Sequence, residues 1–389
     1  MHGLTILSLL LLDGVILPSQ LTLATQSPSA LQYVLSEEQD KRAVNTIGCI
    51  MNKLDIDLEL LMLPWARAKR ELNEGKVDGV FLTSPDEIAG GISSSPILLE
   101  KWFLFQRKSV VEQGARDRLG VVRGSDIENW LLDNQLLPLI KARDTAQLVQ
   151  QFEAGRIDYF VADDSQVRFL FKAPVGHREF LRYVPKTLTF SAAVVQRFPD
   201  LQEQFNATID KCDPQVRALS DSERQQVKDF ITEHLLHRFN GTLQPMIEQW
   251  LLRVKEASPD MLEKLEAQWQ AELQGTSGAL IKQIVHNGLA QKLRDIQQEL
   301  SVIAELMLTQ QNGELIAASV VTSDYWQGDE LKVQALSYQP LYISSLHYDA
   351  STRQFLTHVS LALSANGQRY ILIVGVRLEQ LLKQGALRL

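Results

Sequence analysis

Trp65 and Arg67 are candidate binding residues, because they directly follow an apolar segment of strand length, 58–63, that ends at Pro64. A tryptophan at the end of a strand can stack on a ligand, and a nearby arginine can pair with a carboxylate through two parallel hydrogen bonds. Alternatively, Trp65 packs beneath the following helix and Arg67 is a solvated residue of its first turn. Both interpretations stay open.

A second candidate is the turn formed by Arg123, Gly124, Ser125 and Asp126, between the apolar segment 119–122 and a helical segment that holds Trp130. Serine caps helix N-termini, and such N-termini attract anions such as carboxylates. Arg123 adds a positive charge beside the turn. Capping alone would also explain these residue types.

Catalytic motifs are missing from the sequence. It has no G-x-S-x-G, H-E-x-x-H, P-loop or glycine-rich dinucleotide motif. The seven histidines are scattered, and only His234 and His237 approach metal-ligand spacing. They are more simply surface residues of an amphipathic helix. Cys49 and Cys212 form no C-x-x-C pair. The sequence therefore predicts neither an enzyme nor a metal or other cofactor.

The composition limits the class of protein further. With 389 residues, of which 45% are hydrophobic, the chain is long enough for two or three domains with real cores. A net charge of −8 and the lack of a basic stripe interleaved with aromatic residues argue against a nucleic-acid partner.

The N-terminus predicts export. An apolar block at 4–12, followed by Pro18, is typical of a secretory signal peptide over 1–19, although the first forty residues hold no Lys or Arg and no A-x-A site. A buried N-terminal strand is the alternative. No other segment has the length of a transmembrane helix, so the mature product is expected to be soluble and periplasmic.

The elements that position these residues form a βαβ unit. A strand at 21–25, a helix at 36–54, the strand 58–63, a helix from Pro64 and a strand at 77–82 predict an α/β fold with a parallel sheet. Ligands of such sheets bind beyond the carboxyl ends of the strands. The segments expected at that mouth are 26–29, 64–67 and 83–86, the last of which contains Ser84.

A pattern in this unit recurs later in the chain. Gly75 and Gly155 each end a helix, an aspartate follows three residues on, and an apolar strand comes next. The repeat predicts two similar lobes. Between them, a serine-rich loop leads into a long apolar strand that contains Trp102. A strand at 188–195 and a helix at 201–211 should return the chain to the first lobe.

The run Pro64-Trp65-Ala66-Arg67-Ala68, followed by a helix and by Gly75-Lys76-Val77-Asp78-Gly79, resembles periplasmic solute-binding proteins of family 3, in the branch of polar amino acid receptors. The resemblance covers 21–239. It implies a two-lobed type II periplasmic-binding-protein fold over 20–240, with lobe I at about 20–102 and 190–240 and lobe II at about 103–189. The ligand-binding residues that it implies are Trp65, Arg67, Ser84, Trp102, Arg123, Ser125 and Asp163.

The family also gives roles to particular residues. An aspartate at the position of Asp163 commonly binds the ligand's ammonium group, whereas its other role would be to cap the next helix. Receptors of this branch often join a cysteine of the first helix to one in a late helix, which implies a Cys49–Cys212 disulfide. Two buried free thiols are the alternative.

Glu87 departs from the family pattern. The receptors carry an arginine at that place, where it clamps the ligand's carboxylate, whereas this chain reads Thr83-Ser84-Pro85-Asp86-Glu87. The departure leaves a cationic ligand, an organic acid held through Arg67 or Arg123, or no small ligand.

After residue 240 the sequence predicts a helical connector, 241–276, and a separate α+β domain, 277–389. Apolar stripes, including one at 281–300, indicate helices whose apolar face is core or a seam for a partner. Asn312-Gly313 and Asn366-Gly367 predict hairpins of an antiparallel sheet. This part resembles a PAS-like sensor domain of the Cache type. Its candidate ligand-binding residues are Asp324, Tyr325, Trp326, Asp329 and Tyr342, although Tyr325 and Trp326 could instead plug the sheet.

These features predict an exported protein that binds a small solute and signals to a separate inner-membrane protein. The alternatives are the solute-binding subunit of an ABC-type transporter, whose partner is a permease, and an adaptor that binds no ligand.

Overall fold

The computed structural model describes residues 16–26, 37–85, 87–107, 118–136, 139–167, 170–171, 177–252, 255–275, 278–349, 352–365 and 367–383. Most of the expected signal peptide, most of the polar loop 26–29, Asp86 and Asn366 lie outside these residues.

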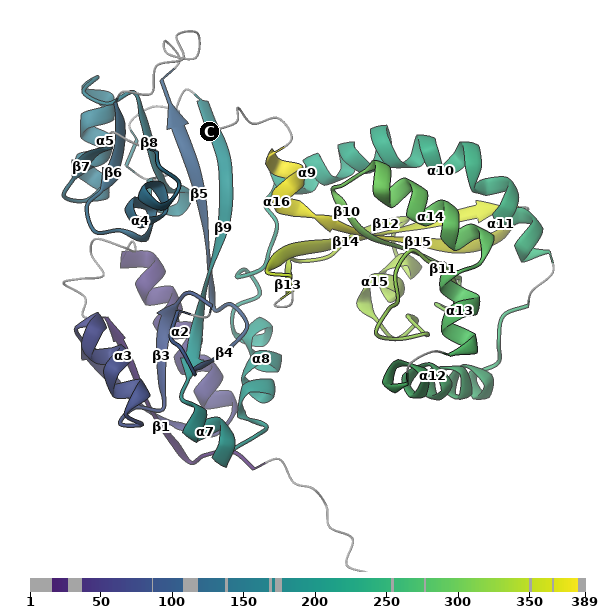
Figure 1. The fold of residues 1–389 in the computed structure, drawn as a ribbon, viewed down its shortest axis with the longest axis horizontal. Helices are drawn as coiled ribbons and strands as arrows, with labels where there is room; N and C mark the ends of the chain where they lie inside the picture. The colour runs from purple at the N-terminus through teal and green to yellow at the C-terminus, as the bar shows by residue number, and fades with distance from the viewer. Residues whose placement is uncertain are drawn as a thin grey trace, which may run out of the picture. The chain divides into compact units, whose positions relative to one another are not determined.

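Internal contacts divide the chain into two compact units (Figure 1). The first unit is Met1–Arg178 with Arg182–Val216, and the second is Glu179–Leu181 with Arg217–Leu389. The sequence placed this boundary near 240. The segment after Val216 belongs with the second sheet because Leu346 N–H donates to the Arg217 carbonyl at 2.7 Å.

The first unit contains a sheet whose strand order is β2-β1-β3-β9-β5-β8-β6-β7, with β4 paired to β9. β1 runs parallel to β2 and β3, and β6 runs parallel to β7 and β8, whereas β9 is antiparallel to β3 and β5 is antiparallel to β8. Each half thus has its own parallel core, as the sequence predicted. The strands are β1 (Gln20–Gln26), β2 (Asp57–Leu63), β3 (Gly79–Thr83), β4 (Ile92–Ser93), β5 (Leu98–Gln106), β6 (Leu119–Val122), β7 (Leu139–Ala142), β8 (Tyr159–Asp163) and β9 (His177–Phe190).

Two separate hydrophobic cores support the two halves. One packs Leu21, Phe81 and Phe190 of the first half's strands against its helices, and the other stacks Phe105 on Phe160, with ring centroids 4.7 Å apart. The unit is therefore two-lobed. Its helices are α2 (Glu37–Lys53), α3 (Trp65–Asn73), α4 (Asp126–Asp133), α5 (Thr145–Glu153), α6 (Asp164–Val167), α7 (Ala192–Arg197) and α8 (Leu201–Cys212).

The repeated glycines act as predicted, since Gly75 and Gly155 end α3 and α5 with φ of 66° and 75°. One expected strand differs. β9 ends at Phe190 and residues 192–197 form α7, because the Ser191 side chain accepts a hydrogen bond from Val194 N–H at 3.3 Å and caps a helix there.

The expected disulfide joins α2 to the end of α8. Cys49 and Cys212 lie with their Cα atoms 5.8 Å apart and their sulfurs bonded. Beside it, Arg42 donates two hydrogen bonds to the carboxylate of Asp213, at 2.5 and 2.7 Å. A covalent bond and a two-pronged ion pair thus fasten the same two helices together.

The second unit contains an antiparallel sheet of order β11-β10-β15-β14-β12, with β13 paired to β14. Gly313 and Gly367 take φ of 89° and 78° between paired strands, in agreement with the hairpins predicted there. The strands are β10 (Ile303–Gln310), β11 (Leu315–Ala318), β12 (Leu341–Ile343), β13 (His347–Asp349), β14 (Gln354–Ala365) and β15 (Gln368–Arg377).

Helices pack on both faces of this sheet. Phe239 stacks on Tyr370 on one face, while Trp269 and Ile284 pack with Met307 and Ile373 on the other. The helix expected over 281–300 is broken, since Asn287 accepts from Ala290 N–H at 2.8 Å and caps a new helix. The helical segments are α9 (Asp221–Phe230), the π-helical η1 (Ile231–Leu235), α10 (Leu236–Thr242), α11 (Gln244–Leu251), α12 (Pro259–Gln274), α13 (Ala279–Val285), α14 (Gly288–Glu299), α15 (Leu331–Gln334), the 3-10 helix η2 (Ala335–Ser337) and α16 (Leu378–Lys383).

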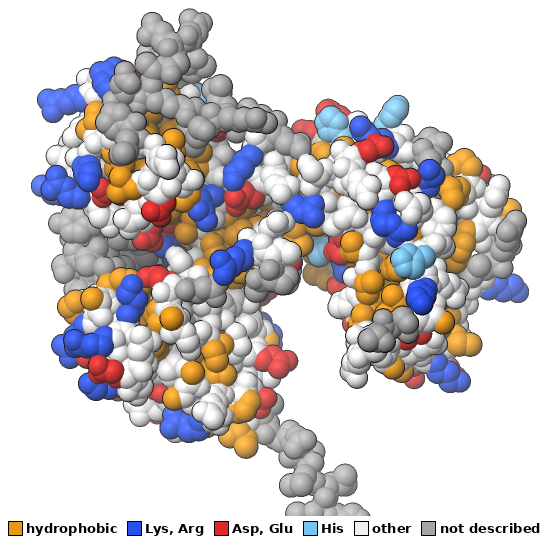
Figure 2. Space-filling view, viewed as in Figure 1, with side chains coloured by type: hydrophobic (Ala, Val, Ile, Leu, Met, Phe, Trp, Pro, Cys, Tyr) orange, Lys and Arg blue, Asp and Glu red, His pale blue; other side chains and the backbone are white. Residues whose placement is uncertain are grey.

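None of the described helices is both long enough and apolar enough to span a bilayer. On the face shown in Figure 2, Lys and Arg side chains are interspersed with Asp and Glu over both units.

Candidate functional site

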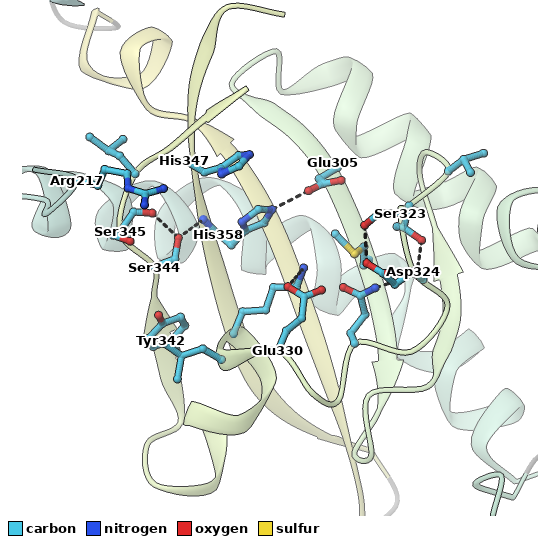
Figure 3. A pocket seen from close by; sticks show the side chains of 17 residues that line it. Arg217, Glu305, Ser323, Asp324, Glu330, Tyr342, Ser344, Ser345, His347 and His358 are labelled. Atoms are coloured by element: carbon cyan, nitrogen blue, oxygen red, sulfur yellow. Dashed lines mark hydrogen bonds and ion pairs between the residues drawn. The ribbon is translucent and has the colours of Figure 1, made fainter. Parts of the chain in front are cut away.

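A cavity of about 480 Å³ opens in the second unit, over the sheet face that carries Glu305, Met307 and His358 (Figure 3). Its volume falls in the range of small-molecule sites. Three segments surround this floor: residues 321–327 after β11, residues 330–332 at the start of α15, and residues 342–347 between β12 and β13.

The floor is a row of three residues on adjacent strands. Glu305 of β10 and His358 of β14 both stand opposite Gly375 of β15. Because glycine has no side chain, the Glu305 carboxylate reaches across the middle strand to His358, with Oε1 and Nε2 2.8 Å apart. A Cβ at position 375 would come within 2.6 Å of Glu305 Cγ. The glycine is therefore required for this pair.

Electrostatics keep Glu305 ionised. Its burial alone would raise the pKa, but the hydrogen bond with His358 and the charges of His358 and Lys332 outweigh burial and lower the pKa of Glu305 below its ordinary value. An ionised carboxylate with basic neighbours therefore lies on the cavity floor.

One wall of the cavity is basic. His347 and Arg217 lie near each other beside the floor (Figure 3). His347 is exposed overall, but desolvation of its ring by the cavity wall, followed by the charges of His358 and Arg217, lowers its pKa. Ser344 fixes this wall to the floor, because its Oγ accepts from His358 N–H at 2.9 Å.

The opposite wall is acidic, and its carboxylates are engaged within the chain. Asp324 accepts from Ser323 Oγ at 2.6 Å, and Glu330 pairs with Lys332 Nζ at 3.0 Å. Tyr342 also lines the cavity, and burial raises the pKa of its hydroxyl.

The five residues predicted for this domain occupy different environments. Asp324 and Tyr342 line the cavity. Tyr325 is buried, and its hydroxyl donates to Glu314 at 3.0 Å. Trp326 donates from Nε1 to the Asn312 carbonyl at 2.7 Å, and the Asp329 carbonyl accepts from Gln334 at 2.9 Å. The sequence patterns did not predict Glu305, His347, His358 or Arg217. A glutamate and a glycine inside apolar strands were the available signals for the floor.

In the first unit, Glu87 accepts hydrogen bonds from Trp65 and Ser84, two of the residues expected to bind a ligand near β3. Trp65 Nε1 donates to one carboxylate oxygen of Glu87 at 2.9 Å, and Ser84 N–H donates to the other at 3.0 Å. Arg67 instead pairs with Glu71 at 2.7 Å and is exposed. Glu87, the residue that departs from the family pattern, therefore links the segments that follow β2 and β3.

Trp102 lies deeper, beside a buried ion network. Its Nε1 donates to Glu100 at 2.8 Å, and Lys186 Nζ lies 3.9 Å from the other Glu100 oxygen and 2.5 Å from Asp126. Burial lowers the pKa of Lys186, but Glu100 and Asp126 outweigh it and raise the pKa overall. Burial also raises the pKa of Glu100, to about 7.

Asp163 and Ser125 both accept hydrogen bonds from backbone N–H groups of the chain. Asp163 accepts from Lys101 N–H at 2.6 Å and from Ser165 N–H at 2.9 Å, and burial raises its pKa. Ser125 caps α4 by accepting from Glu128 N–H at 3.1 Å. Arg123 is exposed beside that cap. The contacts with Ser165 and Glu128 are those of a turn and a helix cap, whereas Lys101 belongs to β5, the strand paired with β8.

Across the described residues, no cluster of three or more His, Cys, Asp or Glu side chains could hold a metal ion. No family model and no curated protein matches the chain.

Several solved structures that are similar to part of the chain are described as solute-binding proteins. An ancestral cationic amino acid solute-binding protein is 14% identical, with a TM-score of 0.38, and covers 55% of this chain and 93% of its own. The L-cystine solute receptor of Neisseria gonorrhoeae, in its unliganded open conformation, is 17% identical, with a TM-score of 0.36. The match covers 49% of this chain and 86% of the receptor. Substrate-binding domain 2 of Lactococcus lactis GlnP is 14% identical, with a TM-score of 0.36. The match covers 51% of this chain and 92% of that domain. Identities and scores this low carry no argument about what this chain binds.

Proposed function

We propose that this chain is an extracytoplasmic ligand-binding protein that recognises a small solute in the cavity of its second unit and signals to a separate inner-membrane protein. The observation that carries the proposal is the cavity itself. It combines a volume of about 480 Å³ with convergent charged and hydrogen-bonding groups from several segments, which is the usual composition of a small-molecule site.

The disulfide supports the location. Disulfides persist in oxidising compartments such as the periplasm and are rare in the cytosol. The bond between Cys49 and Cys212 is therefore in keeping with an exported protein.

The first unit favours a second candidate function, that of an adaptor. Glu87 engages Trp65 and Ser84, and Lys186 is held by Glu100 and Asp126. A ligand between the lobes would have to displace these internal contacts. In this version of the proposal the first unit presents a surface to the partner and the second unit reads the solute.

Thermal melting of the full chain against amino acids, polyamines and organic acids tests the proposal. A ligand at 100 times its dissociation constant adds about 2.7 kcal/mol to the free energy of unfolding, which moves the melt by several degrees. Ser345 lines the cavity and is exposed, so we expect Ser345→Trp to fold and to abolish the shift.

The matched control is Ser337→Trp, at an exposed serine of η2 outside the cavity lining. It should leave the shift intact. A shift that survives Ser345→Trp would move the ligand to another site, and the absence of any shift would favour the adaptor function for the whole chain.

A further inference from the structure

A second row of residues crosses the cavity face of the sheet, next to the row that begins at Glu305. Met307 of β10 stands opposite Ile373 of β15. Ile373 is paired in turn with Ser360 of β14, and Ser360 with Tyr342 of β12. Met307 and Tyr342, at the two ends of the row, both line the cavity. Because directly opposed residues of a sheet lie on one face, Ser360 lies on the cavity face as well.

The hydroxyl of Ser360 is buried and unsatisfied. Ser360 is 0% exposed, and its Oγ has no hydrogen-bond partner among the described residues. A buried hydroxyl without a partner destabilises the folded state relative to an apolar side chain of similar size. A molecule bound in the cavity could supply the missing hydrogen bond.

Tyr342 separates this hydroxyl from the open part of the cavity. Val333 of α15 and Leu336 of η2 belong to the same apolar cluster as Met307, Ile373 and Tyr342, and both are buried. Tyr342 is only half-buried, and it stands on β12, at the end of the sheet order. Among these side chains it is therefore the one that can turn aside with the least loss of packing.

We propose that Ser360 forms the deep end of the ligand site, where its Oγ hydrogen-bonds to an uncharged hydroxyl or amide group of the ligand once Tyr342 turns aside. This inference rests on the proposed function, because it names the ligand class of the same cavity. The ligand's group is uncharged because Met307 and Ile373 offer no counter-charge to an ion. A serine oxygen both donates and accepts, so it suits a hydroxyl or an amide.

Ser360→Ala tests the state of the hydroxyl in the empty protein. Because the variant removes an unpartnered polar group, it should melt at the same temperature as the parent or a few degrees higher. Ser319→Ala is the matched control, since Ser319 is also buried but accepts from Leu306 N–H at 2.9 Å. That variant should melt lower. A Ser360→Ala variant that melts below the parent would overturn the inference, because the hydroxyl would then have a partner within the chain.

A thiol at the same position tests access from the cavity. The chain's two cysteines are bonded to each other, so Ser360→Cys adds a single free thiol. We expect iodoacetamide to alkylate this thiol in the folded full chain, and more slowly when Ser345→Trp blocks the cavity, as measured by mass spectrometry. Ser319→Cys, at a buried serine outside the cavity lining, should react only in denaturant. Equal rates for the two thiols in the folded chain would refute the deep site.

Paired probes test the ligand class by calorimetric titration of the full chain. The pairs are serine with alanine, malate with succinate, and asparagine with leucine. The first member of each pair carries a hydroxyl or amide that the second lacks. We expect at least one first member to bind about two- to tenfold more tightly than its partner. Ser360→Ala should reduce this ratio to about one, and Ser319→Ala should leave it unchanged.

The outcomes separate the two proposals. If no probe and no compound of the melting panel binds, the proposed function fails together with the inference. If a compound binds and Ser345→Trp abolishes its binding, but Ser360→Ala leaves its affinity unchanged, the ligand-binding function stands and the role of Ser360 is overturned.

Discussion

Glu100 is a buried carboxylate of the first unit. One of its oxygens accepts no hydrogen bond from the described residues and lies 3.9 Å from Lys186 Nζ. Its pKa, raised to about 7 by burial, lies above the ordinary value of 4.5. The protonated form is therefore the one that the folded state favours. This contribution to stability is complete below about pH 4.5 and is lost as the pH rises through 7.

Glu100→Gln keeps the shape of the side chain and removes its titration. We expect the variant to gain stability relative to the parent protein between pH 5 and pH 8, by at most about 3 kcal/mol. Denaturant unfolding at a series of pH values measures the difference. Equal pH dependence in the two proteins would show that Glu100 stays ionised beside Lys186.

Glu128 provides a control of opposite sign. It is also buried, but its hydrogen bond with Lys141 outweighs desolvation and lowers its pKa. Its contribution to stability is present at neutral pH and is lost as the pH falls. Glu128→Gln should therefore lose stability relative to the parent protein at pH 8, where Glu100→Gln gains it.

The residues that the sequence could predict are those whose role is local. Gly75 and Gly155 end helices and Ser125 caps one, all of which follow from their neighbours in sequence. Glu305 and His358 meet only because Gly375 stands between them on a third strand. That register depends on pairing between strands far apart in the chain, which a single sequence does not reveal.

At the scale of elements, the disulfide that attaches α2 to α8 is expected to contribute several kcal/mol to the free energy of unfolding. The disulfide closes a loop with a sequence separation of 163 residues, for which the loss of chain entropy in the unfolded state amounts to up to about 5 kcal/mol. The doubly bonded Arg42–Asp213 pair beside it holds the same helices without a covalent bond.

We expect the double variant Cys49→Ala, Cys212→Ala to lower the free energy of unfolding of the first unit by several kcal/mol, as measured by denaturant unfolding. Treatment of the parent protein with a reductant should produce the same loss, while the double variant should be insensitive to it. A variant as stable as the parent would mean that packing and the ion pair suffice.

The boundaries of helices and strands were predicted correctly where the sequence showed a recognisable capping residue. Where the cap was not recognised, the predicted boundary was wrong. Pro64 and Gly75 bound α3 as expected. Ser191 and Asn287, by contrast, are helix caps placed within apolar stretches. There the apolar pattern predicted a continuous strand or helix, and the cap interrupted it.

For the whole molecule, the division into two compact units predicts a localised response to ligand. Binding in the cavity should slow hydrogen exchange at the amides that fasten its wall, such as Leu346, which donates to Arg217, and His358, which donates to Ser344. The first unit should exchange at an unchanged rate.

Hydrogen exchange of the full chain with saturating ligand, read by mass spectrometry, measures this prediction. The Ser345→Trp variant with the same ligand is the control, since its cavity is blocked. Equal slowing in both units would show that they respond together, and slowing confined to residues near Trp102 and Lys186 would move the binding site to the first unit.

The bond between Cys49 and Cys212 also determines how the first unit would bear mechanical tension. A pull on the chain outside these residues enters at one sulfur and leaves at the other, so the residues between them carry no load. They include β2, β3 and the strands from β4 to β9. Among the described strands and helices of the first unit, β1 and the part of α2 before Cys49 lie in the loaded path, and β1 is held in parallel register by both β2 and β3. Extension of the unit would therefore require β1 to be sheared from between β2 and β3. The remaining strands would stay folded, because the disulfide keeps the load off them.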